Sequence, residues 1–319
     1  MLRQTFLASL LATAPVFAQR CDSVIPILPP KNVTVPPTNG TAGHNGTTFL
    51  ISARQFTPEP DYPPTPAPPT IPLYVHVVAG SNARKDGYLT EQEVIDQVNI
   101  IHDLFKPRGI SFRHDASMRQ WVVNASWAGP DRDFNEMKEA LHKGDYRTIN
   151  LYIRNITIRD YGGSCSNPWT QEEIWNVPFP RRLLQDGCVI NTETLAGSGH
   201  SFMNMGKTAV HEIGHWFGLF HTYEAGTVRD GVNPPNPCWA GNPGDEVKDT
   251  PRCKNVSPAG QCNMTQNTCP EPAGEKPVYD AVWNYMSESS DACYQNFTVG
   301  QQERMYFIYD KYRAGETRG

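Results

Sequence analysis

The spacing of hydrophobic and polar residues divides the chain near residue 71. Residues 19–70 are rich in Pro, Thr, Asn and Gly, and such a composition cannot bury a hydrophobic core. This segment is therefore expected to be extended or disordered, either as a glycosylated linker or as a pro-segment. The remaining residues, 71–319, have a globular composition and are numerous enough for one domain or for two subdomains around a cleft.

Strands and helices alternate in the first half of this globular region. The apolar run IPLYVHVVAG (71–80) predicts a buried strand. Residues 90–109 have the period of an amphipathic helix, in which Thr90 is the N-cap and Glu93 completes a capping box. Further strands are predicted at 110–115, 149–156 and 188–195, and further helices at 131–145 and 206–220. This alternation predicts an α/β (α+β) fold with a mixed sheet.

The N-terminus has the features of a cleaved secretory signal at residues 1–18. One arginine precedes an apolar run from Phe6 to Phe17, and Val16 and Ala18 have the spacing that signal peptidase prefers. No later stretch approaches the roughly 20 apolar residues of a transmembrane helix, so we expect a soluble, exported protein without membrane contact. Eight N-glycosylation sequons agree with this route: Asn32, Asn39, Asn45, Asn124, Asn155, Asn255, Asn263 and Asn296.

Cysteine content and charge limit the compartment and the partners further. All eight cysteines follow the predicted signal, and an even number in an oxidising compartment suggests up to four disulfides. Five of them lie in 238–293, where disulfides would replace regular structure.

The formal net charge is −5 and Lys and Arg form no cluster, which argues against nucleic acid and anionic membranes as partners. We expect a monomer.

The segment HEIGHWFGLFH (211–221) carries the candidate chemistry. On a helix, His211 and His215 are about one turn apart and direct their imidazoles to one point. Glu212 is displaced by roughly 100°, where it could reach a metal-bound water. His221 could not reach the same point if the helix continued. Gly218 can adopt the left-handed conformation that ends a helix, and this would return His221 to the metal.

The extended pattern HExxHxxGxxH is more specific than HExxH, which also arises by chance in helices. Three histidines leave one zinc position open for water, whereas a structural zinc site is usually closed by four protein ligands. The pattern therefore predicts a catalytic Zn²⁺ on His211, His215 and His221, with Glu212 activating the zinc-bound water. Two alternatives stay open: a catalytically weak or silent secreted zinc-fold binding module, and a zinc hydrolase of other chemistry, such as a deacetylase or an esterase.

With this pattern the chain resembles the metzincin metallopeptidases. NYMS (284–287) matches the turn beneath the zinc in that group, and GDEVKDTP (244–251), CNMTQNTCP (262–270) and DACYQNFTVGQQERM (291–305) resemble the pappalysin family, with its ulilysin-like and fungal secreted members. The resemblance extends over roughly 73–312. It implies a catalytic domain in 71–319 with a zinc-binding helix near 206–218, a Met-turn near 284–287, and a smaller, irregular, disulfide-stapled C-terminal subdomain ending in a helix. It also implies a secreted zinc endopeptidase that cleaves extended peptide or protein substrates.

The resemblance also implies further site residues. The segment that matches GDEVKDTP binds calcium in relatives, which nominates Asp245, the Val247 carbonyl and Thr250, with Asp249 close by; the alternative is a solvated acidic loop. Met286 would form the hydrophobic floor beneath the zinc ligands. Family disulfides would pair Cys238–Cys269 and Cys262–Cys293, and the cysteines that remain would pair as Cys165–Cys188 and Cys21–Cys253.

Three further expectations concern catalysis and its control. Relatives generally have a tyrosine two residues after the methionine, thought to stabilise the transition state, but this chain has Glu288 there, and neither Tyr285 nor Tyr294 is equivalent. Weakened or altered activity would agree with this departure. Substrate is expected to pair with an edge strand at Val189–Leu195. A free Cys21 thiolate in the precursor would occupy the open zinc position until the N-terminal segment is removed; a disulfide is the alternative.

Overall fold

The computed structural model describes residues 62–129, 134–156, 162–168, 179–223, 238, 244–254 and 261–314. The predicted signal peptide, Cys21 and the sequons Asn32, Asn39, Asn45 and Asn255 fall outside these ranges. Of the other sequons, Asn263 and Asn296 are exposed, and Asn124 and Asn155 are half-buried. Among the described residues, no helix has the length and apolar character needed to cross a membrane.

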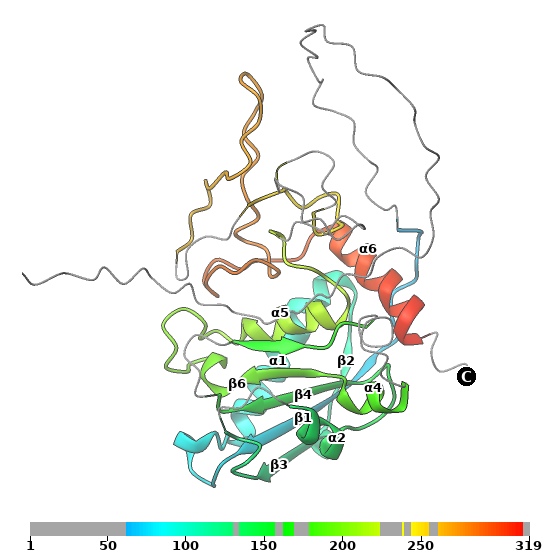
Figure 1. Ribbon diagram of the computed structural model, residues 1–319, viewed down its shortest axis with the longest axis vertical. Coiled ribbons are helices and arrows are strands. Elements are labelled where there is room, and N and C mark those ends of the chain that lie inside the picture. Colours follow the sequence, from blue (N-terminus) through cyan, green and yellow to red (C-terminus); the bar gives the residue numbers. More distant parts are fainter. Residues whose placement is uncertain are drawn as a thin grey trace, which may run out of the picture.

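A mixed sheet of six strands forms the centre of the molecule (Figure 1). Its first strand, β1 (Ile71–Ala79), pairs in parallel with β4 (Ile149–Arg154) on one side. On its other side β1 pairs with β2 (Phe112–Arg113) and then with β3 (Arg119–Val123), both in parallel. Strand β6 (Cys188–Asn191) follows β4 in parallel, and β5 (Gly163–Cys165) completes the sheet as an antiparallel edge. The mixed sheet predicted from the sequence is therefore confirmed.

The strand that was expected to form the edge is an internal strand. β6 lies between β4 and β5, so the prediction that Val189–Leu195 offers a free edge to substrate is wrong. The strand is also shorter than predicted, because the Asn191 side chain accepts a hydrogen bond from the Glu193 backbone and starts a 3₁₀ turn at Thr192–Thr194 (η4). The edge strand is β5, which is too short to give a periodic sequence signal.

Helices cover both faces of the sheet. α1 (Glu91–Phe105) begins with the predicted capping box and is followed by a 3₁₀ turn at Lys106–Arg108 (η2). It packs with α5 (Lys207–Trp216) and α6 (Val299–Ile308) in the main hydrophobic core on one face.

α2 (Asn135–Leu141) covers the other face of the sheet, and α4 (Phe179–Gln185) lies beside α2. Three further 3₁₀ or π turns are Arg84–Asp86 (η1), Ala116–Met118 (η3) and Tyr309–Ala314 (η5).

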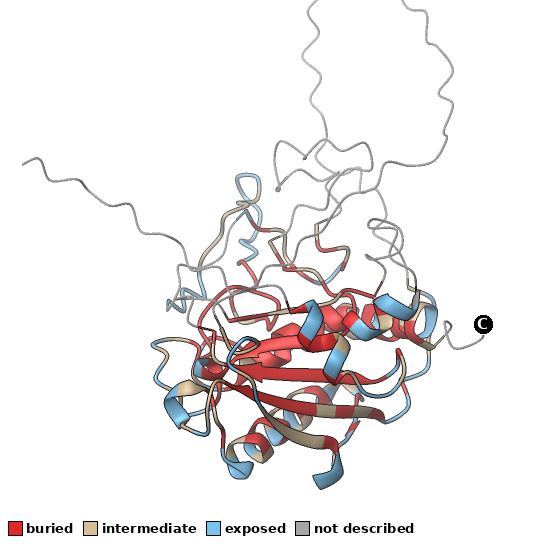
Figure 2. Ribbon diagram, turned by 60° about the horizontal axis from the view of Figure 1, so that its bottom comes forward, coloured by how far each residue is buried: buried red, intermediate tan, exposed pale blue. Residues whose placement is uncertain are grey.

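The polar residues of β4 are buried, as its apolar ones are. Figure 2 shows the central strands of the sheet coloured as buried. Ile149, Leu151 and Ile153 enter the main core. On the other face, the Asn150 side chain lies 2.9 Å from Nε2 of His76, whose ring stacks on Tyr152. Burial lowers the pKa of His76 to about 4, so this histidine is neutral in the folded protein. The alternation of polar and apolar residues in 149–156 therefore reflects a strand that is packed on both faces, and not one with a solvent-exposed face.

Disulfides organise the edge strand and the irregular C-terminal region. Cys165–Cys188 joins β5 to β6, and Cys238–Cys269 and Cys262–Cys293 join loops of the C-terminal half. These three pairings are the expected ones. Cys253 is a buried thiol, and because Cys21 falls outside the described ranges, Cys21–Cys253 stays a prediction. The C-terminal region ends in a helix, α6, as the resemblance implied.

The folded body begins before Ile71. Residues 62–70 have no regular secondary structure, yet the Tyr62 ring packs 5.3 Å from that of Phe307 on α6, and Pro68 is buried. Figure 1 shows this blue segment running beside α6. The composition of 19–70 suggested a boundary at residue 70, but extended proline-rich chain can pack on an existing surface without a core of its own.

Candidate active site

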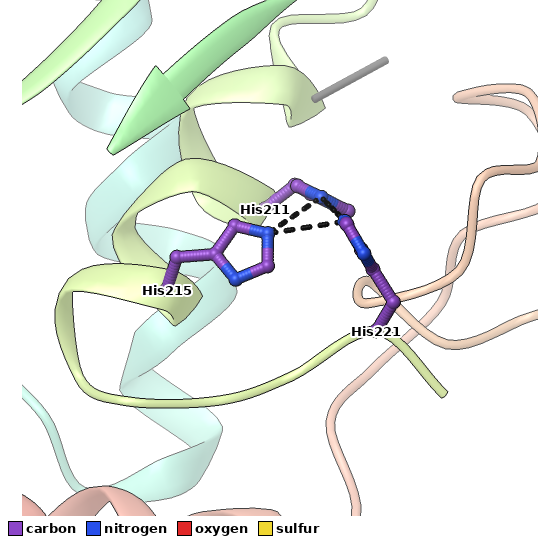
Figure 3. Close-up of side chains that lie close together, drawn as sticks. All are labelled: His211, His215 and His221. Carbon is purple, nitrogen blue, oxygen red and sulfur yellow. Dashed lines mark hydrogen bonds between the residues drawn. The ribbon is translucent and has the colours of Figure 1, made fainter. Parts of the chain in front are cut away.

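The end of α5 brings the three histidines together (Figure 3). His211 and His215 lie on α5, which ends at Trp216. Gly218 has φ +88°, a left-handed conformation that favours glycine. Its backbone N–H donates to the carbonyl of His215 at 2.8 Å, and that of Leu219 donates to Gly214 at 3.0 Å. This pair of bonds is a Schellman motif, which reverses the chain and directs His221 back towards the helix.

The three imidazoles meet through their Nε2 atoms. Each pair among His211, His215 and His221 has its Nε2 atoms 3.2 Å apart. All three side chains are buried, and among the described residues they form the one group of potential metal-binding side chains whose ligand atoms lie within 4.8 Å of one another. A separation of this size fits three vertices of a tetrahedron whose centre is about 2.0 Å from each nitrogen, the usual Zn–N distance.

The hydrogen bonds on the opposite ring nitrogens favour the binding of a cation at this point. Nδ1 of His211 lies 2.6 Å from the Tyr285 carbonyl, and Nδ1 of His215 lies 2.8 Å from the Leu219 carbonyl. A carbonyl can only accept, so both Nδ1 atoms carry protons, and each ring in its neutral form directs an Nε2 lone pair inwards. Lone pairs 3.2 Å apart repel unless a cation lies between them. The donor set therefore fits a divalent metal that prefers imidazole.

Glu212 lies beside the histidines in a tightly enclosed position. Its side chain is completely buried, and a Cβ atom added at Gly163 would approach Oε1 to 2.9 Å. The edge strand β5 thus lies against the carboxylate, and glycine is needed there because of the close approach. Lys138 is a buried residue of α2, and its Nζ donates to the Gly187 carbonyl at 2.9 Å. Burial lowers the pKa of Lys138 to about 8, opposed by the charges of Asp186 and Glu212.

Met286 lies in a turn beneath α5, within the range 284–287 given by the resemblance. The Ser287 N–H donates to the Asn284 carbonyl at 3.0 Å, which closes the turn. The fully buried Met286 sulfur lies so close to Gly214 that a Cβ at that position would clash with it. The carbonyl of the preceding residue, Tyr285, accepts a hydrogen bond from His211. The turn therefore orients one imidazole, and the Met286 side chain fills the space under the helix.

Neither tyrosine near the Met286 turn takes the place of the catalytic tyrosine that the resemblance implies. The hydroxyls of Tyr285 and Tyr294 donate to the backbone carbonyls of Gln295 and Ser287. Glu288 instead faces the site, with Oε1 3.2 Å from Nε2 of His221 and both side chains buried. Tyr223 was not anticipated: its hydroxyl lies 3.2 Å from Nδ1 of His221 and its ring stacks on the imidazole. A single aromatic residue outside any periodic segment gives no sequence signal for such a role.

The acidic loop brings together three of the four oxygen donors nominated for calcium. The Thr250 hydroxyl lies 2.6 Å from Oδ1 of Asp245 and 2.9 Å from the Val247 carbonyl. Asp249 differs, because its Oδ2 accepts from the backbone N–H of Gly300 in the first turn of α6 at 2.9 Å. A carboxylate at a helix N-terminus is stabilising there, so Asp249 fastens the loop to α6.

Comparison with known proteins decides the family. The model of peptidase family M43, described as pregnancy-associated plasma protein-A, matches residues 142–310. An extracellular metalloprotease of Colletotrichum graminicola is 37% identical over 248 residues, which cover 77% of this chain and 78% of the relative. An extracellular metalloprotease of Podospora anserina is 36% identical, over 76% of this chain and 74% of the relative. The chain belongs to the M43 peptidase family.

Solved structures show the same fold. Mature mirolysin of Tannerella forsythia in complex with a cleaved peptide has a TM-score of 0.58 and 21% identity, over 78% of this chain and 97% of that chain. Mirolysin in complex with a small compound has a TM-score of 0.59 and 21% identity, over 77% and 93% of the two chains. The M43 member described here is therefore an extracellular metalloprotease with a metzincin-type fold and a histidine triad at its centre.

Proposed function

We propose that the chain is a secreted zinc-dependent endopeptidase in which His211, His215 and His221 hold the catalytic zinc and Glu212 is the general base. The observation that carries this proposal is the set of 3.2 Å Nε2 separations, with the Nδ1 atoms of two rings bonded to carbonyls. When bound, zinc would polarise the scissile carbonyl and make water acidic enough to attack near neutral pH.

Glu212 performs the proton transfers in this mechanism. Its carboxylate follows His211 directly on α5 and is enclosed by β5, so it has little freedom to move away from the reacting atoms. It accepts the proton that the attacking water loses, and then donates that proton to the nitrogen of the leaving amine. Exclusion of solvent from the buried carboxylate strengthens its interactions with the reacting groups.

The edge of β5 that pairs with none of the described strands is the part of the sheet that suits an extended substrate. β5 pairs with β6 on one side, and Ser164 and Cys165 are half-exposed. A peptide that adds to this edge as a further strand would gain main-chain hydrogen bonds, and Gly163 would place it next to Glu212. The substrates are accordingly extended segments of proteins, bound chiefly through their main chain.

Cleavage of a denatured protein tests this proposal. Casein should be cut by the purified secreted protein, and both Glu212→Ala and a zinc chelator should abolish the cutting. Glu193→Gln is a matched control, because Glu193 is an exposed carboxylate just after β6 and should leave activity unchanged. Undiminished cleavage by Glu212→Ala would contradict the role of Glu212.

Glu288 favours one alternative function, that of a zinc-fold binding module with little or no catalysis. Its carboxylate lies 3.2 Å from Nε2 of His221, where a negative charge opposes the oxyanion of peptide hydrolysis. Stoichiometric zinc without cleavage of casein, even after removal of the N-terminal segment, would support this alternative. Cleavage that depends on Glu212 would exclude it.

The loop at 244–250 is a second proposed metal site, for structural Ca²⁺. A hydroxyl has one proton, yet the Thr250 oxygen has two acceptor oxygens within 2.9 Å, Asp245 Oδ1 and the Val247 carbonyl. Converging oxygens of this kind suit calcium. Calcium should raise the melting temperature of the protein, and Thr250→Val should remove most of that rise. Equal stabilisation of both proteins would contradict the site.

A further inference from the structure

Arg304 is a buried cation at the turn that delivers the third histidine. It lies on α6 and is 2% exposed. Its Nε donates to the carbonyl of Gly218 at 2.8 Å, and its guanidinium lies 4.6 Å from the centre of the Phe220 ring. Arg304 therefore touches two of the residues between the end of α5 and His221. The carbonyls at a helix C-terminus are the groups that a cation stabilises there.

Two other groups hold the guanidinium in this position. Nη1 lies 2.7 Å from Oε2 of Glu246, in the loop that Asp249 fastens to the start of α6, and Nη1 also donates to the Tyr62 hydroxyl. Burial lowers the pKa of Arg304, but the Glu246 charge and Tyr62 outweigh it, so the net shift is upwards. The guanidinium is thus charged, ion-paired and held by several bonds at once, which fixes its orientation.

Tyr62 is contributed by the segment that precedes the sheet. Its hydroxyl accepts from Arg304 and donates to the Glu246 carbonyl at 2.9 Å, and its ring packs on Phe307. Burial raises the pKa of Tyr62 to about 12, so the phenol keeps its proton at neutral pH. A continuous series of contacts therefore runs from the N-terminal segment through Arg304 to Gly218 and on to the metal-binding histidines.

We propose that Arg304 is a positioning residue for the third metal ligand, and that Tyr62 is the part of this support supplied by the N-terminal segment. The inference rests on the proposed metal site. Arg304 restrains the carbonyl of Gly218, and this restraint fixes the reversal of chain that places Nε2 of His221 3.2 Å from the other two. A chain cleaved before Tyr62 keeps the support, and a chain cleaved after it loses the support. The affinity for the metal would thereby depend on whether the chain retains Tyr62.

Metal binding tests the inference without reference to catalysis. The zinc dissociation constant is measured by competition with a chromophoric chelator, and the absorption bands of the Co²⁺-loaded protein report the coordination geometry. Arg304→Lys should weaken zinc binding by about 10-fold to 100-fold, the range found for groups that support a ligand. Tyr62→Phe, which keeps the ring and removes only the hydroxyl, should weaken it by a smaller factor and shift the Co²⁺ bands in the same direction.

Tyr306→Phe is the matched control. Tyr306 is also on α6, and its hydroxyl donates to the Arg108 carbonyl, away from Gly218. It should lower stability about as much as Tyr62→Phe while leaving the zinc dissociation constant unchanged. If Tyr62→Phe binds zinc as tightly as the unsubstituted protein, the role of the N-terminal segment is wrong. If Arg304→Lys also binds equally well, the whole inference is overturned. A failure of the unsubstituted protein to bind zinc would instead overturn the proposed function, and this inference with it.

Discussion

The carboxylate oxygen Oε1 of Glu288 lies 3.2 Å from Nε2 of His221, the nitrogen that faces the other two imidazoles. Glu288 follows Met286 by two residues, at the position where the resemblance to the pappalysin family implies a tyrosine. A phenol can donate a hydrogen bond to a developing oxyanion, whereas an ionised carboxylate repels it.

Glu288→Tyr should therefore increase peptide cleavage. A single donor to the oxyanion is worth about 10²-fold to 10³-fold in kcat, so even an imperfectly placed hydroxyl should raise kcat/KM by about 10-fold. Glu288→Gln, which removes the charge and keeps the shape, should give a smaller increase. Steady-state cleavage of a fluorogenic peptide measures both. A fall in kcat/KM for both variants would mean that the carboxylate takes part in the reaction.

The conformation of Gly218 should be needed for metal binding. At φ +88° a side chain costs about 1–2 kcal/mol, and Gly218→Ala would also shift the path of the chain to His221. We expect both lower stability and a higher zinc dissociation constant. Gly197 has φ +76°, and no atom lies within 4 Å of the place that a Cβ would take, so Gly197→Ala carries the same backbone cost away from the site. Equal zinc affinity in the two variants would contradict the prediction.

The acid stability of the protein should depend on His76. Its pKa is lowered from 6.5 to about 4 by burial, so the unfolded chain binds a proton over this range and the folded protein does not. The contribution of this histidine to stability is present above pH 6.5 and is lost as the pH falls towards 4, by about 3 kcal/mol in all.

Denaturant unfolding at several pH values measures this loss. Metal-free protein is used, so that release of metal at low pH does not contribute. His76→Gln should be less stable at neutral pH but should lose less stability between pH 6.5 and 4. A pH dependence identical to that of the unsubstituted protein would show that other groups cause the acid destabilisation.

Removal of the Cys165–Cys188 disulfide should affect substrate binding. This bond joins the edge strand to β6, and the two cysteines are 23 residues apart. Replacing both by alanine should cost about 3 kcal/mol of stability and raise KM more than it lowers kcat, because the edge strand becomes mobile. Replacing Cys238 and Cys269, 31 residues apart, should cost a similar amount without the rise in KM. Equal KM values in the two variants would argue against β5 as the substrate edge.

The sequence predicted those parts of the site that depend on helical periodicity and on glycine conformation. The spacing of His211 and His215 and the need for Gly218 follow from the geometry of a helix and its end, and the structure has both features. The capping box of α1 follows from local chemistry in the same way.

Features that depend on distant contacts could not be obtained from local patterns. The three-residue edge strand β5 was missed, and β6 was assigned to the edge, because strand order is decided by packing between segments far apart in the chain. Tyr62 was placed in the proline-rich segment 19–70, a linker or pro-segment whose composition gave no reason to expect contact with α6. Arg304 did leave a signal: it lies with Gln301, Met305 and Ile308 on one helical face, and a charge in that buried stripe calls for a partner.

The zinc content of the purified protein tests the central claim most directly. Native mass spectrometry of the secreted protein should show one zinc ion per chain at the triad, and His221→Ala should lose it while a control such as His200→Ala keeps it. Full retention of that zinc in His221→Ala would contradict the claim that His211, His215 and His221 together hold the catalytic metal.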